Sequence, residues 1–99
     1  MDERQRGYLF RGMVYNKALE RYGKETQIVV AVEELSEATK ELCKFLRGKG
    51  DIDHLAEEVA DAFIMLEQVE RMYGISDKVT REMERKTLRL AQRVQADKE

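Results

Sequence analysis

Proline is absent from this 99-residue sequence, and its six glycines lie mostly between segments in which apolar residues recur at helical spacing. A chain that lacks the strongest helix breaker and keeps glycine for segment ends favours helices over strands. Charged residues make up 38% of the chain and apolar residues 42%, which suits amphipathic helices with solvated outer faces. We therefore predict an all-α protein that forms one small domain.

Cysteine and histidine are almost absent too, with Cys43 and His54 the only examples. One cysteine forms no intrachain disulfide and cannot build a cysteine-based zinc site. A ferritin-like di-iron bundle needs Glu-x-x-His on two helices, which one histidine cannot supply. Because the chain lacks a signal-peptide core and any apolar run long enough to span a bilayer, we expect a soluble, cytoplasmic protein. A net charge of −2 gives no general affinity for nucleic acid or membranes.

Apolar spacing and turn residues predict four helices, at about 8–22, 25–47, 51–73 and 77–95. Residues 1–7 lack periodicity and are predicted to be a flexible arm, followed by a single helical domain of residues 8–97. Gly23 and Gly74 are suited to end helices. The side chains suited to N-caps are Thr26, Asp51, Asp53 and Ser76.

The predicted helices differ in how much apolar surface they carry. The expected core-facing stripe of the second helix comprises Ile28, Val32, Leu35, Ala38, Leu42, Phe45 and Leu46. The third helix is apolar almost all round, so we expect it to be buried on most sides. The last helix carries only a narrow apolar stripe. Such helices are hard to bury within one 99-residue subunit, and we expect self-association into a larger helical bundle.

Two acidic clusters stand on consecutive predicted helices, Glu33-Glu34-Leu35-Ser36-Glu37 and Glu57-Glu58-Val59-Ala60-Asp61. Residues three apart on a helix project from one face, so Glu34 pairs with Glu37 and Glu58 pairs with Asp61. If the helices pack antiparallel, four carboxylates meet in one groove and repel unless cations neutralise them. Asp61 also interrupts an apolar stretch, where a charge is costly unless it is paired or bound to metal. Oxygen-only ligands suit Mg²⁺, Mn²⁺ or Ca²⁺.

Carboxylate-bound Mg²⁺ usually completes its shell with substrate phosphates, so we expect a phosphate-bearing substrate. Lys86, Arg89 and Arg93 share one flank of the last helix and could meet outer phosphates. Alternatively, they form a solvated flank that pairs with neighbouring acids. Gln27 lies two turns before Glu34 on the same face and could reach a ligand. His54 lies one turn before Glu58 and could approach the site, or it could be an ordinary residue of the first turn.

With these residues, the chain resembles the MazG-like family of all-α nucleoside triphosphate pyrophosphohydrolases, which also includes dimeric dUTPases and phosphoribosyl-ATP pyrophosphatases. The family's mark is Glu-x-x-Glu, a spacer and Glu-x-x-Asp, matched here by Glu34 to Glu37, a 20-residue spacer and Glu58 to Asp61. A later Lys-x-x-x-Asn-x-x-Arg element matches at Lys86 and Arg93, but Leu90 takes the place of its asparagine. The resemblance covers roughly residues 15–95.

The resemblance implies hydrolysis of a nucleoside triphosphate to the monophosphate and pyrophosphate, as in the house-cleaning of nucleotide pools. The residues it implies as catalytic Mg²⁺ ligands are Glu34, Glu37, Glu58 and Asp61, and Glu37 or Glu58 could also accept a proton from water. Relatives form dimers or tetramers, in line with the poor self-burial of the predicted helices. The alternative is a non-catalytic helical bundle, a binding or regulatory protein, in which the acids form salt bridges with residues such as Lys40, Lys44, Lys86 and Arg93.

Overall fold

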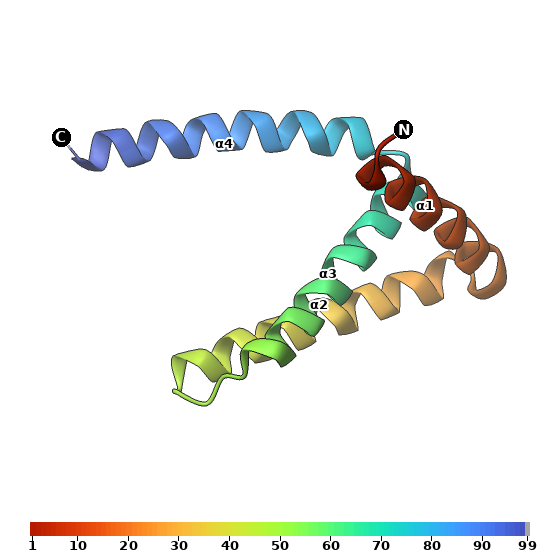
Figure 1. Cartoon of the computed structure of the whole chain (residues 1–99), viewed down its shortest axis with the longest axis horizontal. Coiled ribbons are helices and arrows are strands. Elements are labelled where there is room, and N and C mark those ends of the chain that lie inside the picture. Colours follow the sequence, from red (N-terminus) through yellow and green to blue (C-terminus); the bar gives the residue numbers. More distant parts are fainter. Residues whose placement is uncertain (99) are drawn as a thin grey trace.

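The computed structural model describes residues 1–98 and contains, within them, four helices and no strand (Figure 1). They are α1 (Glu3–Tyr22), α2 (Lys24–Leu46), α3 (Ile52–Tyr73) and α4 (Ser76–Lys98). The predicted all-α class and the number of helices are confirmed. Across residues 1–98, no helix combines the length and apolarity that a bilayer crossing requires.

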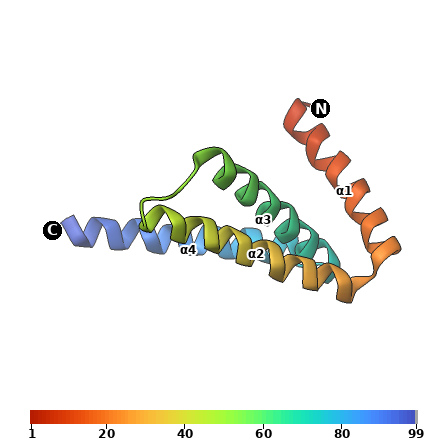
Figure 2. The ribbon, with the colours of Figure 1, turned by 90° about the horizontal axis from the view of Figure 1, so that it is seen from below.

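The central unit of the fold is the pair formed by α2 and α3, which contact each other more extensively than any other two helices among the described residues. They run side by side from the short loop at residues 47–51 (Figures 1 and 2). Helices α1 and α4 leave the other end of this pair in different directions. Because α4 touches α3 only slightly, most of its length stands away from the rest of the molecule.

Local signals explain several helix ends, although Ser76, expected as an N-cap, is the first residue of α4 itself. Asp51 accepts hydrogen bonds from the backbone N–H groups of Asp53 and His54, as expected for an N-cap. Gly74 ends α3 in the left-handed region at φ 62°, also as expected. Thr26 was wrongly predicted as a cap, because Gly23 alone separates α1 from α2 and the second helix begins without a side-chain cap.

The first helix begins five residues earlier than expected. Asp2 caps it by accepting a hydrogen bond from the Gln5 N–H at 2.8 Å, while the Gln5 side chain accepts one from the Asp2 N–H at 2.9 Å. This reciprocal pair is a capping box, which satisfies two backbone donors at the helix start. Residues 3–7, predicted to belong to an arm outside the helices, are therefore part of α1.

A polar clamp joins α1 to α3. Arg11 donates to both carboxylate oxygens of Glu67, with Nε–Oε1 at 2.8 Å, and the buried Tyr15 hydroxyl donates to Oε1 at 2.5 Å. These donors lower the pKa of Glu67, the Arg11 hydrogen bond contributing most. Gly12 is part of the same contact, since a Cβ at this position would lie 3.0 Å from the Arg71 guanidinium carbon. The clamp holds α1 at a fixed position along α3.

The chain buries very little apolar surface by itself. Only Tyr15, Ala31 and Met65 are buried apolar residues among those described, and the radius of gyration is 16.6 Å. A compact domain of this length has a radius of gyration of about 13 Å. The open arrangement therefore lacks the central core that independent domains of this size possess.

Two predictions about burial are wrong for the single chain. The α2 face toward α3 buries Gln27, Ala31 and Glu41, and the stripe predicted as core lies largely exposed, with Val32 60% and Leu42 56% exposed. The third helix also leaves Phe63 65% exposed, although its middle is apolar almost all round. The reason is that one neighbour covers one face of a helix, and α1 and α4 do not cover the other faces.

Candidate metal site

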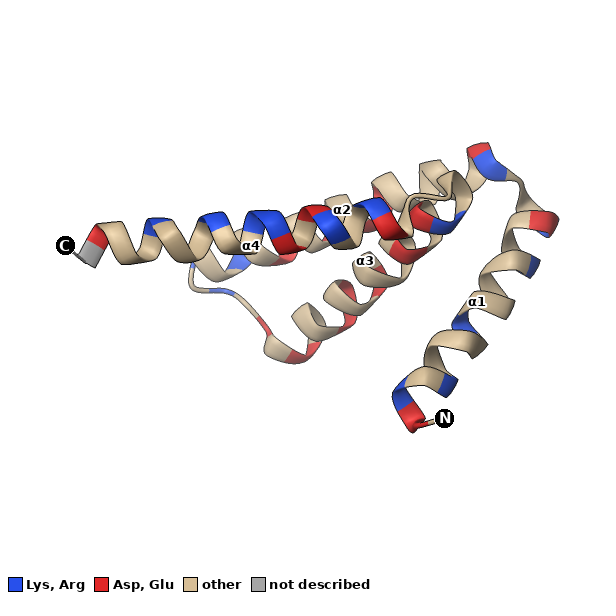
Figure 3. Ribbon diagram, turned by 90° about the horizontal axis from the view of Figure 1, so that it is seen from above, with Lys and Arg blue, Asp and Glu red and all other residues tan. Residues whose placement is uncertain are grey.

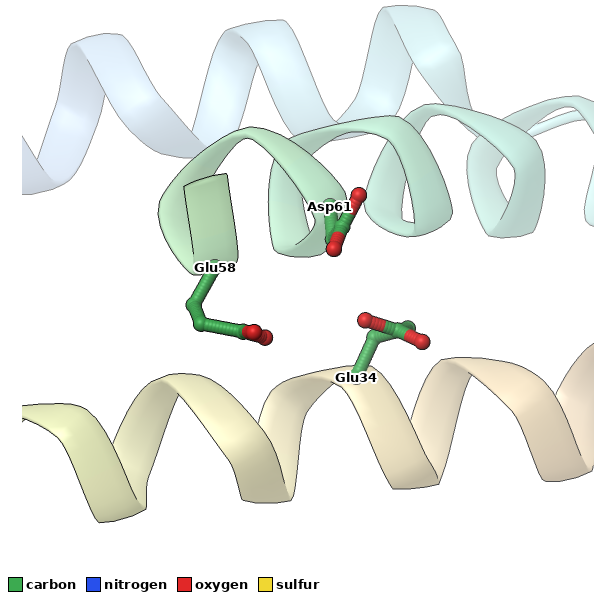
Figure 4. A group of neighbouring side chains, drawn as sticks. All are labelled: Glu34, Glu58 and Asp61. Atoms are coloured by element: carbon green, nitrogen blue, oxygen red, sulfur yellow. The ribbon is translucent and has the colours of Figure 1, made fainter. Parts of the chain in front are cut away.

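Three of the four predicted acids converge between α2 and α3. Glu34 on α2 projects toward α3, while Glu58 and Asp61 project from successive turns of α3 toward α2 (Figure 4). One carboxylate oxygen from each residue lies within 4.8 Å of the other two. Spacing of three residues places Glu58 and Asp61 on one helix face, and helix pairing brings Glu34 opposite them.

The neighbouring carboxylates disfavour the ionised form of Glu34. The pKa of Glu34 is raised above its ordinary value, first by burial and then by the charges of Asp61 and Glu58. Each of these causes disfavours the ionised carboxylate. A cation between the helices reverses the effect, because it turns repulsion among three anions into shared attraction.

The donor set fits a hard divalent cation. All three ligand candidates offer carboxylate oxygens, the atoms that Mg²⁺, Mn²⁺ and Ca²⁺ prefer. Glu34 and Glu58 are partly buried, whereas Asp61 is exposed in the single chain. The expectation that Asp61 is buried in apolar surroundings is therefore wrong, and repulsion from neighbouring acids is the stronger argument for a cation.

Glu37 stands apart from these three acids. Its side chain is about half exposed, and its Oε1 lies 3.7 Å from Lys40 Nζ on the same helix. Its charge still contributes to the raised pKa of Glu34, so it lies within electrostatic range of the cluster. The structure therefore places Glu37 at the rim, beside the converging carboxylates.

The basic residues predicted to meet phosphates are not brought to the acids within one chain. Lys86, Arg89 and Arg93 are exposed on α4, which carries both charge signs along its length (Figure 3). The pKa of Glu82 is lowered, mainly by its hydrogen bond with Arg85 and to a smaller extent by the charges of Lys86 and Arg89. Local pairing on α4 is thus observed.

The two further ligand candidates occupy different environments. Gln27 is 6% exposed on the α2 face that carries Glu34, seven residues before it. His54 does approach the acids, since its Nε2 lies 3.5 Å from Glu58 Oε1. His54 also lies in the first turn of α3, and its side chain is half exposed, so both expectations for this residue stay open.

Sequence reasoning overlooked Glu41, which is 2% exposed and lies between α2 and α3. Its Oε1 is 2.8 Å from Lys44 Nζ and 3.3 Å from His54 Nδ1, and its Oε2 has no hydrogen-bond partner among the described residues. Burying a carboxylate with one unsatisfied oxygen costs free energy. The spacing contained a signal, because Glu41 lies seven residues after Glu34 and therefore on the same helix face.

Comparisons of the chain with models of known protein families, with curated proteins and with solved structures give no match. The argument for a functional site at the residues that carry the resemblance therefore depends on their geometry alone. That geometry consists of three carboxylates converging from two paired helices, a fourth carboxylate at the rim and a histidine against one of the three.

Proposed function

We propose that this protein is a Mg²⁺-dependent nucleoside triphosphate pyrophosphohydrolase that releases a nucleoside monophosphate and pyrophosphate. The observation that carries the proposal is the convergence of Glu34, Glu58 and Asp61 within 4.8 Å, on two helices whose acidic motif resembles that of MazG-like enzymes. The same oxygen ligands would also bind Mn²⁺. Removal of unwanted nucleotides from cytoplasmic pools is the role that fits such an activity.

In the proposed mechanism, the carboxylates of the chain would position the cation and accept a proton from water. Glu34 would hold the cation from α2, and Glu58 and Asp61 would hold it from α3. When bound, Mg²⁺ would lower the pKa of a water molecule and neutralise charge on the phosphates. Glu37, at the rim, or Glu58 would accept the proton of the attacking water as pyrophosphate leaves. Asp61, on the exposed side, would face the entering triphosphate.

We also propose that the working enzyme is a homo-oligomer, a dimer or a tetramer. Large apolar side chains on all four helices are exposed in the single chain, including Phe10, Val32, Phe63 and Leu90. Another copy would cover these faces. It would also supply basic residues, because Lys86, Arg89 and Arg93 stand on the projecting α4, away from the acids of their own chain.

A panel of ribo- and deoxyribonucleoside triphosphates tests the proposal. With Mg²⁺ present, the folded oligomer should release pyrophosphate from at least one of them, and chelation of the metal should stop the release. Detection of pyrophosphate separately from orthophosphate distinguishes this reaction from stepwise removal of the terminal phosphate. Failure to release pyrophosphate from any triphosphate would reject the proposed activity.

A second candidate is a non-catalytic helical-bundle protein that binds or regulates a partner. Two ion pairs on α2 favour it, since Glu37 lies near Lys40 and Glu41 contacts Lys44. Acids that serve only in such pairs need no cation. Thermal unfolding with and without Mg²⁺ separates the candidates, because only a cation site predicts a rise in melting temperature on adding Mg²⁺.

A further inference from the structure

A second group of charged residues continues the line of the three acids toward the loop end of α2 and α3. Its centre is Glu41, whose side chain is 2% exposed although it carries a carboxylate. Lys44 Nζ lies 2.8 Å from Glu41 Oε1 and fixes that oxygen. Surface glutamates are free to turn into solvent, but Glu41 is held inside the helix pair, where its Oε2 finds no hydrogen-bond partner within residues 1–98.

His54 connects this buried carboxylate to the candidate metal site. Its Nδ1 lies 3.3 Å from Glu41 Oε1, and its Nε2 lies 3.5 Å from Glu58 Oε1. The two ring nitrogens thus lie beside carboxylates on opposite helices. Glu58 is one of the three converging acids, and its side chain is only 15% exposed. A continuous path therefore runs from Lys44 through Glu41 and His54 to Glu58.

We propose that Glu41 and His54 are positioning residues for the cation site. Lys44 and burial hold Glu41, Glu41 orients the His54 ring, and the ring keeps the Glu58 carboxylate turned toward Glu34 and Asp61. Partners of this kind, outside the ligands themselves, typically change metal affinity about 10- to 100-fold when they are replaced. The inference rests on the proposed function, since it assigns a role to residues beside the same cation site.

A purely structural role for the two residues makes a different prediction. If Glu41 and His54 only joined the ends of α2 and α3, replacing them would lower the stability of the metal-free protein and leave cation affinity unchanged. His54 is suited to this distinction because its side chain is 46% exposed, so a polar replacement fits without repacking. Asp53 offers a matched control one residue earlier, exposed and outside the path.

The experiment measures Mn²⁺ binding to the full-length protein, without nucleotide, by electron paramagnetic resonance of the free ion. Glu41→Gln and His54→Gln should each weaken Mn²⁺ binding roughly 10-fold, and Asp53→Asn should bind like the wild type. The double variant should bind no more weakly than His54→Gln alone, because Glu41 acts through the histidine. Metal-free melting temperatures and circular dichroism show whether each variant remains folded.

The outcomes separate this inference from the proposed function. Wild-type affinity in His54→Gln, or losses that add in the double variant, would overturn the positioning role and leave the hydrolase proposal intact. Weakened Mn²⁺ binding in the variants of a protein that hydrolyses no triphosphate would support the positioning role and reject the proposed activity. A wild-type protein that binds no Mn²⁺ would overturn both.

Discussion

Asp61 projects from the middle of α3 toward Glu34 on α2, in a stretch whose other residues are mostly apolar. Its side chain is exposed in the single chain, so burial is not what makes its charge unfavourable. The pKa of Glu34 is raised first by its own burial and then by the charges of Asp61 and Glu58, so these neighbours disfavour its ionised form. Under the proposed function, a cation bound between the helices would relieve this repulsion.

Replacing Asp61 with asparagine should separate catalysis from folding. Because the side chain loses its charge but keeps its shape, Asp61→Asn should lower Mg²⁺-dependent pyrophosphate release at least 100-fold, roughly 2.7 kcal/mol of barrier. The metal-free variant should be as stable as the wild type or up to about 1 kcal/mol more stable, since one repelling charge is removed. Pyrophosphate assays and chemical denaturation measure the two effects.

The matched control is Glu57→Gln, which neutralises an exposed acid on α3 outside the converging group. Its activity should stay within a few-fold of the wild type. Normal turnover in Asp61→Asn, or an equal loss in both variants, would contradict the assignment of the site.

The clamp between α1 and α3 predicts how stability depends on pH. Burial, followed by the hydrogen bond to Glu67, raises the pKa of Tyr15 from 10.0 to about 12. Above pH 10 the unfolded chain therefore releases this proton before the folded chain does, and stability falls as pH rises from 10 toward 12. Glu67 has the opposite shift: its pKa is lowered below 4.5, so its contribution is lost as pH falls through that lowered value.

Tyr15→Phe isolates the alkaline part of this dependence. At neutral pH the variant should lose about 1 kcal/mol of unfolding free energy, because a hydrogen bond to a carboxylate is removed. Above pH 10 the difference should shrink, since only the wild type loses the contribution of Tyr15. Denaturation at constant protein concentration measures both. A difference that stays constant across this range would contradict the raised pKa.

At the scale of single residues, the sequence predicted the site in part. Helical spacing alone placed Glu58 beside Asp61, and antiparallel pairing of two helices placed Glu34 opposite them. Spacing could not show that Glu37 lies near Lys40, nor that Glu41 is buried. Those positions depend on how closely α2 and α3 approach along their length, which no local pattern encodes.

At the scale of helices, local chemistry predicted some of the ends, and periodicity did not predict which face of each helix is packed. Asp51 and Gly74 act where their side-chain and backbone preferences indicated. Periodicity identified the apolar stripe of α2 that contains Val32 and Leu42, but not its partner. The face packed on α3 buries Gln27, Ala31 and Glu41 instead. An apolar stripe indicates which residues favour burial, but the tertiary or quaternary arrangement determines which residues pack against them.

Gly74 sets the direction of α4, and its replacement tests this element. At φ 62° an alanine is strained, so Gly74→Ala should lower the unfolding free energy by about 1 kcal/mol. The control is Gly7→Ala inside α1, where a Cβ would meet Arg11 at 3.4 Å and helix propensity favours alanine by up to about 1 kcal/mol. Denaturation should therefore give opposite signs for the two variants, and a stabilised Gly74→Ala would refute the role of the turn.

At the scale of the whole molecule, the open shape leaves large apolar side chains exposed on all four helices. Burial of three apolar residues gains far less free energy than the loss of conformational entropy in some ninety helical residues costs. A single chain would therefore not be stable in this arrangement. In the proposed homo-oligomer, contact with further copies would supply the missing burial. The exposed stripe of α2 is well placed for such contact because it lies beside the acid-bearing face, not on it.

Leu42→Lys tests whether that stripe is an interface between copies. The wild type should run as a dimer or tetramer at micromolar concentration in size-exclusion chromatography with light scattering. A lysine in place of a 56% exposed leucine should weaken assembly roughly 100-fold, since apolar area is lost and a charge is buried. If folding depends on assembly, as we propose, helicity and Mn²⁺ binding should then fall together on dilution.

Glu33→Gln provides the control for this substitution, since it changes the net charge by the same amount on an exposed residue of α2 outside the stripe. Its assembly should match that of the wild type, which would tie the loss in Leu42→Lys to the stripe and not to overall charge. A wild-type chain that is monomeric and fully helical at micromolar concentration would contradict this account, because its stability would then have to come from the few contacts within one chain. Coincident loss of mass, helicity and cation affinity in Leu42→Lys alone would show that the cation site depends on a fold that only the assembly sustains.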